Sequence, residues 1–285
     1  MAGRIEPIPL RIAGEPGLAG EEVVAAEGIG DEGRAPVVVL HGLTATRRYV
    51  VHGSVALARR GHRMVLYDAR GHGESDPAGA AGDYGYGDLA GDLRRVLAER
   101  CPGEAPILIG HSMGAHTAAA LALSRSAGLA GLVLICPASL GEPILDEAAA
   151  YWDRLADGLE RGGVEGFLDA YDEDLDPEWR ETLLRIARER LSRHRSPEAV
   201  ADALRAVPRS LPFEGLGELE FLGVPTLVVA SRDEADPGHP YAIAEAWAER
   251  IPGAELISED PGSSPLAWQG GRLSRAIADW AERAL

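Results

Sequence analysis

Short runs of apolar residues alternate along the chain with longer segments in which apolar residues recur every third or fourth position. Apolar runs of about four to eight residues are typical of buried strands, and the second spacing is typical of amphipathic helices. Their alternation predicts a mostly parallel sheet flanked by helices, which is the α/β class. The predicted strands are 36–40, 64–67, 106–109, 131–135 and 225–230, with a weaker strand at 255–258 and an antiparallel edge formed by 10–13 and 22–26.

The alternation stops between residues 141 and 216, where the pattern is helical throughout. We therefore expect a single α/β domain over 1–285, with a helical lid at 141–216 inserted between two strands. The alternative is a second helical layer that gates nothing. The segment carries several aromatic residues, which either line an acyl or aromatic pocket or, as we favour, form its own core: Tyr151, Trp152, Phe167, Tyr171 and Trp179.

The strand predicted at 106–109 leads into the run G-H-S-M-G at 110–114 and then into an alanine-rich helix. A G-x-S-x-G run between a strand and a helix is the pattern of a nucleophile elbow, a tight turn that exposes a serine hydroxyl. The flanking glycines remove Cβ atoms that would collide with the neighbouring strand and helix. The amino end of the helix favours a developing oxyanion. Ser112 is therefore the candidate nucleophile.

The run H-G-L at 41–43 follows another predicted strand directly. A loop there can aim the backbone N–H of Leu43 at a substrate oxygen, with the N–H of Met113 as the second donor. Each donor of such an oxyanion hole is worth about 3 kcal/mol. His41 is interpreted as structural. In the loop after the strand at 64–67, Asp68 and Arg70 are predicted to pair as a brace.

In this order, the three motifs resemble the α/β-hydrolase fold family, in its lid-bearing esterase and lactonase-like branch, over nearly the whole chain. The resemblance implies an eight-stranded, mostly parallel sheet and a Ser–Asp–His triad in that chain order. It also implies an acyl-enzyme mechanism that needs no cofactor.

The family's acid lies in the turn after the strand at 225–230, often as D-P-x-x-P. Asp236 fits that pattern, while Asp233 lies closer to the strand end and remains a competitor. The family's histidine follows the last strand, but Ser263 stands in that place and no histidine occurs after His239. A serine hydroxyl does not take up a proton near neutral pH as an imidazole does. The base is therefore not identified.

Three solutions remain open for the base. A histidine from elsewhere can reach Ser112, with His239 beside the acid turn the best placed, and His41 and His72 as further options. A group of the substrate can act instead. Alternatively, positioning and the oxyanion hole alone support a slow reaction. The other histidines that we considered are predicted to be packed against the sheet (His116) or at the surface and helix ends (His52, His62 and His194).

The composition of the chain limits the kinds of molecule that it is expected to bind. The formal charge of −17 argues against nucleic acid and against an anionic membrane surface, because both need clustered Lys and Arg. No segment approaches the roughly 20 apolar residues of a membrane span. Two cysteines, Cys101 and Cys136, make no disulfide framework, and no metal-binding spacing occurs. We expect a cytoplasmic protein without metal or cofactor that acts on a small-molecule substrate; the sequence does not indicate its oligomeric state.

Two functions compete at this point. The first is a serine hydrolase for a small carboxylic ester, thioester or lactone. Ser112 would attack, Leu43 and Met113 would hold the oxyanion, and Asp236 would orient the unidentified base. The second is a non-hydrolytic member of the fold, either a ligand-binding protein or a lyase or cyclase, which the serine at position 263 would suit.

Overall fold

One eight-stranded sheet organises the chain, with strand order β1-β2-β4-β3-β5-β6-β7-β8. The computed structural model describes residues 5–24, 34–125, 128–232, 236–260, 268 and 271–285. The strands are β1 (Ile8–Ile12), β2 (Leu18–Val23), β3 (Val37–Leu40), β4 (Met64–Tyr67), β5 (Ile107–His111), β6 (Gly131–Ile135), β7 (Thr226–Val229) and β8 (Glu255–Ile257). Only the pairings of β1 with β2 and of β2 with β4 are antiparallel, so the predicted α/β class and the antiparallel amino-terminal edge are confirmed.

The register of the central strands brings three predicted motifs to one edge of the sheet. β3 is parallel to both β4 and β5, and Leu40 is level with Tyr67 on one side and with Gly110 on the other. The residues that follow these strands therefore leave the sheet side by side. The carboxyl edge of a parallel sheet is where open α/β folds place their ligand sites.

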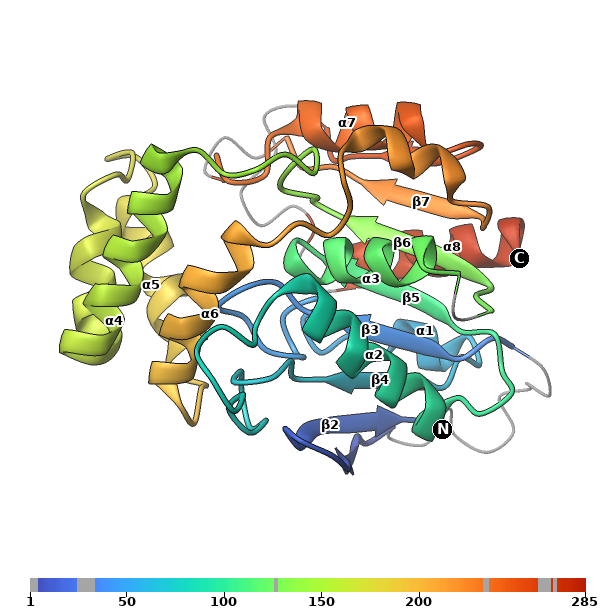
Figure 1. The fold of residues 1–285 in the computed structure, drawn as a ribbon. Helices are drawn as coiled ribbons and strands as arrows, with labels where there is room; N and C mark the ends of the chain where they lie inside the picture. The colour runs from blue at the N-terminus through green and yellow to red at the C-terminus, as the bar shows by residue number, and fades with distance from the viewer. Residues whose placement is uncertain (1–4, 25–33, 126–127, 233–235, 261–267, 269–270) are drawn as a thin grey trace.

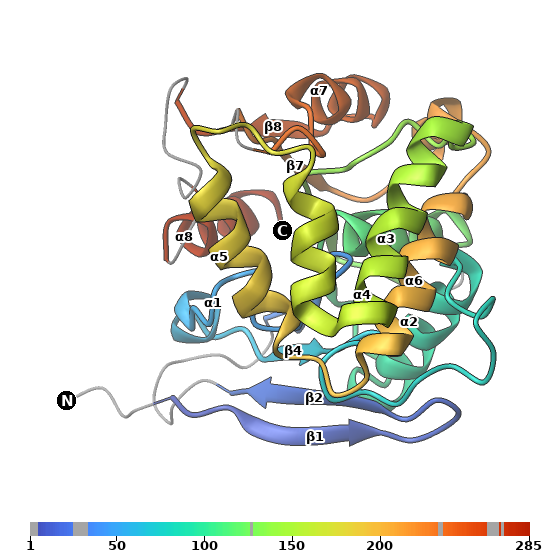
Figure 2. The same cartoon turned by 90° about the vertical axis from the view of Figure 1, so that its left-hand side faces the viewer.

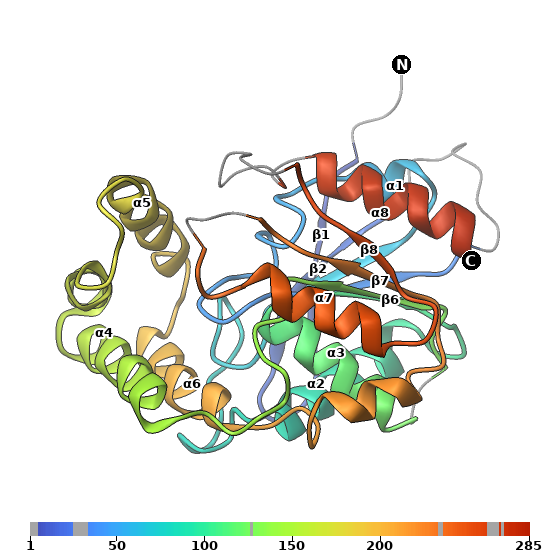
Figure 3. The ribbon, with the colours of Figure 1, turned by 90° about the horizontal axis from the view of Figure 1, so that it is seen from above.

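Helices cover both faces of the sheet (Figure 3). The helices are α1 (Ala56–Arg59), α2 (Tyr86–Arg100), α3 (Met113–Leu123), α4 (Asp146–Asp172), α5 (Arg180–Leu191), α6 (Pro197–Arg209), the 3-10 helix η1 (Leu216–Phe221), α7 (Tyr241–Arg250) and α8 (Gly271–Ala284). Successive side chains of β3 belong to two apolar cores, one on each face of the sheet. Val38 and Leu40 pack with α2, α3 and α7, whereas Val37 and Val39 pack with α1 and α8. Both faces of the strands are thus buried, which is why they appear in the sequence as unbroken apolar runs.

Three helices, α4, α5 and α6, fill the chain between β6 and η1 and lie beyond the carboxyl ends of the parallel strands (Figures 1 and 2). α4 bends at Gly163, whose φ of 60° and ψ of −145° are not helical. The segment has its own apolar core, which includes Phe167 and against which Tyr151, Trp152 and Tyr171 pack. The favoured interpretation of its aromatic residues therefore holds for these four. That the segment is a lid stays a prediction.

The end of α5 is fastened to the sheet domain through one buried histidine. His194 accepts a hydrogen bond from the Gly73 N–H at 2.8 Å and donates one to the Thr44 carbonyl at 2.9 Å. The next residue, Arg195, donates its N–H to the Gly73 carbonyl at 2.9 Å. His194 is 8% exposed and lies just beyond the end of α5, so of the two positions expected for it, surface or helix end, the second is confirmed.

The predicted pairing of Asp68 with Arg70 was also wrong. Asp68 pairs with Arg47, which reaches it from the loop after β3, and Arg70 makes a two-pronged ion pair with Asp92 of α2 at 2.7 and 2.8 Å. Each partner comes from another element, so neighbours in the sequence were a poor guide. Within the described ranges, no helix is both long and apolar enough to cross a bilayer.

Candidate active site

Ser112 lies in a strained turn between β5 and α3. Its φ of 52° and ψ of −116° fall where residues with a side chain rarely occur. The turn is held on both sides, because the Ser112 N–H donates to the Ile135 carbonyl at 2.9 Å and the His116 N–H donates to the Ser112 carbonyl at 3.1 Å. A strained residue that its surroundings hold in place is a frequent feature of functional sites.

The glycines around Ser112 are required by close backbone contacts. A Cβ on Gly110 would lie 2.2 Å from the Gly114 carbonyl oxygen, and one on Gly114 would lie 2.3 Å from the Leu40 carbonyl oxygen. Gly42 also passes close, since a Cβ there would lie 2.8 Å from Nδ1 of His111 and 3.2 Å from the Ser112 Cβ. The loop that carries Leu43 therefore runs directly beside the Ser112 side chain.

A chain of two hydrogen bonds joins Ser112 to the turn after β7. The His239 Nδ1 lies 2.8 Å from Oδ2 of Asp236, and its Nε2 lies 2.8 Å from Oγ of Ser112. Because a carboxylate only accepts, Nδ1 carries the imidazole proton and Nε2 is free to accept the proton of the Ser112 hydroxyl. The structure thus brings together Ser112, Asp236 and one of the candidate bases. Asp233 and Ser263 lie outside the described residues.

Burial and charge set the ionisation around this chain. Burial would raise the pKa of the Asp236 carboxyl, but the charge and hydrogen bond of His239 hold that pKa below its ordinary value. His111, in the elbow itself, packs its ring 5.3 Å from that of His239. Burial and the neighbouring His239 lower the pKa of His111 to about 3, with Asp236 acting in the opposite direction. His111 is therefore neutral near neutral pH.

The backbone N–H groups of the two predicted oxyanion donors have no hydrogen-bond acceptor within the described residues. In the described part of the chain, neither the Leu43 N–H nor the Met113 N–H donates a hydrogen bond. Met113 is the first residue of α3, so its amide belongs to the unpaired amino end of that helix. Unpaired amides beside a nucleophile are what an oxyanion hole requires.

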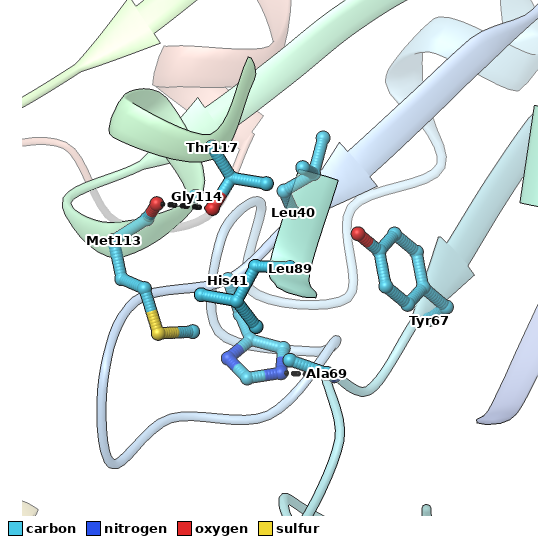
Figure 4. A pocket seen from close by; sticks show the side chains of 8 residues that line it. All are labelled: Leu40, His41, Tyr67, Ala69, Leu89, Met113, Gly114 and Thr117. Carbon is cyan, nitrogen blue, oxygen red and sulfur yellow. Dashed lines mark hydrogen bonds between the residues drawn. The ribbon is translucent and has the colours of Figure 1, made fainter. Parts of the chain in front are cut away.

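Beside the elbow, a small cavity of about 10 Å³ lies between His41, Met113 and their neighbours (Figure 4). It has room for about one water molecule, so it is not a substrate pocket. His41 accepts the Ala69 N–H at 2.8 Å and pairs with the Gly42 carbonyl at 2.8 Å. These bonds occupy both ring nitrogens and tie the Leu43 loop to the loop after β4, as expected of a structural histidine.

The other histidines are engaged away from Ser112. His72 donates to the Arg70 carbonyl at 2.9 Å, and burial holds its pKa well below the ordinary value. His116 accepts the Ala138 N–H at 3.0 Å and packs edge-on against Trp247. His62 is buried just beyond the end of α1 and His52 is exposed, so both fit the expectation of a surface or helix-end position.

Comparison with known proteins places this geometry in a family. The sequence profile of the alpha/beta hydrolase fold matches residues 35–268. The chain belongs to the α/β-hydrolase fold family. It is 32% identical to "Putative carbamate hydrolase RutD" of Variovorax paradoxus, over 80% of this chain and 84% of that protein. It is 28% identical to a 2-hydroxy-6-oxononadienedioate/2-hydroxy-6-oxononatrienedioate hydrolase of Burkholderia vietnamiensis, over 79% and 78% of the two chains.

Solved structures agree on the fold. A thermophilic esterase from Thermogutta terrifontis superposes with a TM-score of 0.75 at 24% identity, over 98% of this chain and 99% of the esterase. With hydrolases among its relatives, this α/β hydrolase is an enzyme of the hydrolase class.

Two residues of the α/β hydrolase's site were not assigned from the sequence. His239 was named only as one of several candidate bases, and the spacing D-P-G-H at 236–239 was the local signal available. His111 was overlooked as a neighbour of the base, although it lies within the elbow motif. Among the described residues, no three His, Cys, Asp or Glu side chains gather as metal ligands would.

Proposed function

We propose that this α/β hydrolase cleaves a small carboxylic ester, thioester or lactone through an acyl-enzyme on Ser112. The observation that carries the proposal is the continuous hydrogen-bonded chain from Asp236 through His239 to Ser112, with both links at 2.8 Å. It provides an acid, a base and a nucleophile in the order that serine hydrolysis requires.

In the first half of the reaction, Oγ of Ser112 attacks the substrate carbonyl carbon while Nε2 of His239 takes the hydroxyl proton. Asp236 stabilises the resulting imidazolium, and the N–H groups of Leu43 and Met113 hold the oxyanion. The tetrahedral intermediate collapses, His239 returns the proton to the leaving alcohol or thiol, and the acyl group remains on Ser112.

In the second half, water replaces the leaving group. His239 removes a proton from the water, the hydroxide attacks the acyl carbon, and the proton passes to Oγ as the carboxylic acid departs. No cofactor is needed at any step. The non-hydrolytic alternative depended on the lack of an identified base. The hydrogen bond between Ser112 and His239 supplies a candidate base and so favours hydrolysis.

We also propose that the segment 141–216 is a lid over this site. Leu43, one of the two oxyanion residues, packs against the core of α4–α6, so the segment borders the site directly. The names of the curated relatives, a carbamate hydrolase and a dienedioate hydrolase, support a small substrate with an attackable carbonyl.

A fluorophosphonate probe tests the proposal, because it labels only an activated serine. We expect Ser112 to be labelled and p-nitrophenyl esters of short chain length to be hydrolysed. Ser112→Ala should abolish both, with a loss in turnover on the order of 10⁶-fold. Serine at position 54, which lies in a loop after β3, provides a matched control variant, Ser54→Ala. Unlabelled protein whose ester turnover survives Ser112→Ala would refute the proposal.

A further inference from the structure

The acid and the base of this hydrolase share one short turn. Asp236 and His239 are three positions apart, and the His239 N–H also donates to the Asp236 carbonyl at 3.2 Å. The two side chains therefore move together. Within the described residues, one hydrogen bond joins them to Ser112 and spans 127 positions of the chain, while Ser112 itself is held by β5, β6 and α3. The distance from the base to the nucleophile thus depends on what holds this turn in place.

A buried carboxylate from the end of β8 holds the start of the turn. Glu259 is 2% exposed, and its Oε1 accepts the Ser231 hydroxyl proton at 2.7 Å and the Arg232 N–H at 2.7 Å. The last backbone bond between the two strands runs from the Ala230 N–H to the Ile257 carbonyl at 2.9 Å. Glu259 therefore extends the β7–β8 pairing by two more donors, into the turn itself.

Further contacts close the turn but are more exposed. The Arg232 side chain donates from Nε to the Ser258 hydroxyl at 3.1 Å and stacks 3.8 Å above the ring of Tyr241, at the start of α7. Hydrogen bonds at the surface contribute little to the stability of the folded protein, whereas bonds to a buried charged group contribute more and are costly to lose. Of these contacts, the carboxylate of Glu259 is the one that water cannot replace.

From this arrangement we infer that Glu259 is a positioning residue for catalysis: it holds the turn that presents Asp236 and His239 together to Ser112. The inference rests on the proposed function. In the related family the segment after the last strand supplies the base itself. In this chain the candidate base lies in the same turn as the acid, after β7. The segment after β8 instead supplies the Glu259 carboxylate, which positions both of them.

The Oε2 atom of Glu259 makes the test selective, because in the described part of the chain it has no hydrogen-bond partner. Glu259→Gln therefore keeps the accepting oxygen, whereas Glu259→Ala removes it. Glu255→Ala is the matched control, since Glu255 lies at the start of β8, four positions before Glu259, with 46% of its side chain exposed. We expect Glu259→Ala to lower kcat on the order of 100-fold with little change in KM, as a misplacement of about 1 Å does. Glu259→Gln and Glu255→Ala should retain near wild-type kcat.

A second measurement does not depend on turnover. The proton on Nδ1 of His239, held by Asp236, gives a downfield NMR signal that is assigned by its loss in His239→Gln. We expect Glu259→Ala to shift or broaden this signal and Glu259→Gln to leave it. Should Glu259→Ala not fold, Ser231→Ala removes one donor of the brace and is expected to lower kcat in the same direction, by less.

The inference would be overturned by a folded Glu259→Ala protein with wild-type kcat and an unchanged signal. It would also be overturned if Glu259→Gln were as impaired as a folded Glu259→Ala protein. Where Glu259→Ala does not fold, a Ser231→Ala protein with wild-type kcat would overturn it. Failure of the proposed function looks different. In that case Ser112→Ala remains active, while the Nδ1 signal still reports whether Glu259 holds the turn.

Discussion

The two halves of the site are built by different means. On the Ser112 side, backbone packs against backbone: a Cβ on Gly110 or Gly114 would collide with main-chain atoms of a neighbouring element. On the Asp236 and His239 side, position depends on side-chain hydrogen bonds at both ends of a turn. Close backbone contacts require glycine at particular positions, and those glycines can be recognised in the sequence. Side-chain bonds between distant segments leave no such pattern.

This difference predicts that the two halves fail in different ways. A change in the glycine-lined half should cost stability, because strands and helix must separate to admit it. A change in the hydrogen-bonded half should cost activity with the fold intact, because the turn lies at the edge of the sheet and is half exposed.

The largest effect is expected for His239→Ala. Removal of the base should lower kcat on the order of 10⁶-fold, as in subtilisin, with the thermal unfolding midpoint nearly unchanged. Exogenous imidazole should restore part of the ester turnover. His52→Ala, at an exposed histidine, is the control and should retain full activity. A His239→Ala enzyme with more than about a tenth of the wild-type turnover would place the base elsewhere.

Asp236→Asn should have the next largest effect. An amide at this position cannot stabilise the imidazolium and permits the wrong tautomer of His239, so kcat should fall on the order of 10⁴-fold. Because neighbouring His239 keeps the pKa of Asp236 below its ordinary value, the carboxylate stays ionised in mild acid. Steady-state kinetics at neutral pH measures the loss. If Asp236→Asn has no effect, another acid, with Asp233 the first candidate, holds the histidine.

The contrast between the two halves also explains what the sequence could and could not predict. The strands and the strand–turn–helix geometry around Ser112 were predicted correctly, because apolar runs and obligatory glycines are local features. The sequence ranked His239 first among the candidate bases but could not assign it, because the assignment depends on the path of a turn relative to Ser112. The same limit made Asp68 and Arg70 appear to be partners, when their true partners lie on other elements.

In the glycine-lined half, Gly114→Ala should destabilise the fold by about 3 kcal/mol. The added Cβ would lie 2.3 Å from the Leu40 carbonyl oxygen, which can move only if β3 or α3 shifts. Gly91→Ala in α2 is the matched control, since no atom lies within 4 Å of its Cβ position. Alanine there should stabilise the helix by about 0.5–1 kcal/mol. Urea unfolding of the two variants measures the difference, and equal stabilities would mean that the elbow is less tightly packed than its geometry implies.

The last prediction is a dependence on pH and concerns the junction between α5 and the sheet domain, which also depends on a side chain. Burial, with the hydrogen bond to Thr44 acting in the opposite direction, lowers the pKa of His194 from 6.5 to about 4. Between these values the unfolded chain binds a proton that the folded protein does not, so stability falls as pH falls and this histidine has no effect above pH 6.5. The slope is about 1.4 kcal/mol per pH unit.

His194→Asn keeps an acceptor for the Gly73 N–H but cannot titrate. We expect it to be less stable than wild type at neutral pH, because the bond to Thr44 is lost, yet to show a shallower decline in stability from pH 6.5 to about 4. Urea unfolding at a series of pH values separates the constant offset from the slope. An unchanged slope would mean that folding does not lower the pKa of His194, and its bonds to Gly73 and Thr44 would then not form a buried, neutral junction.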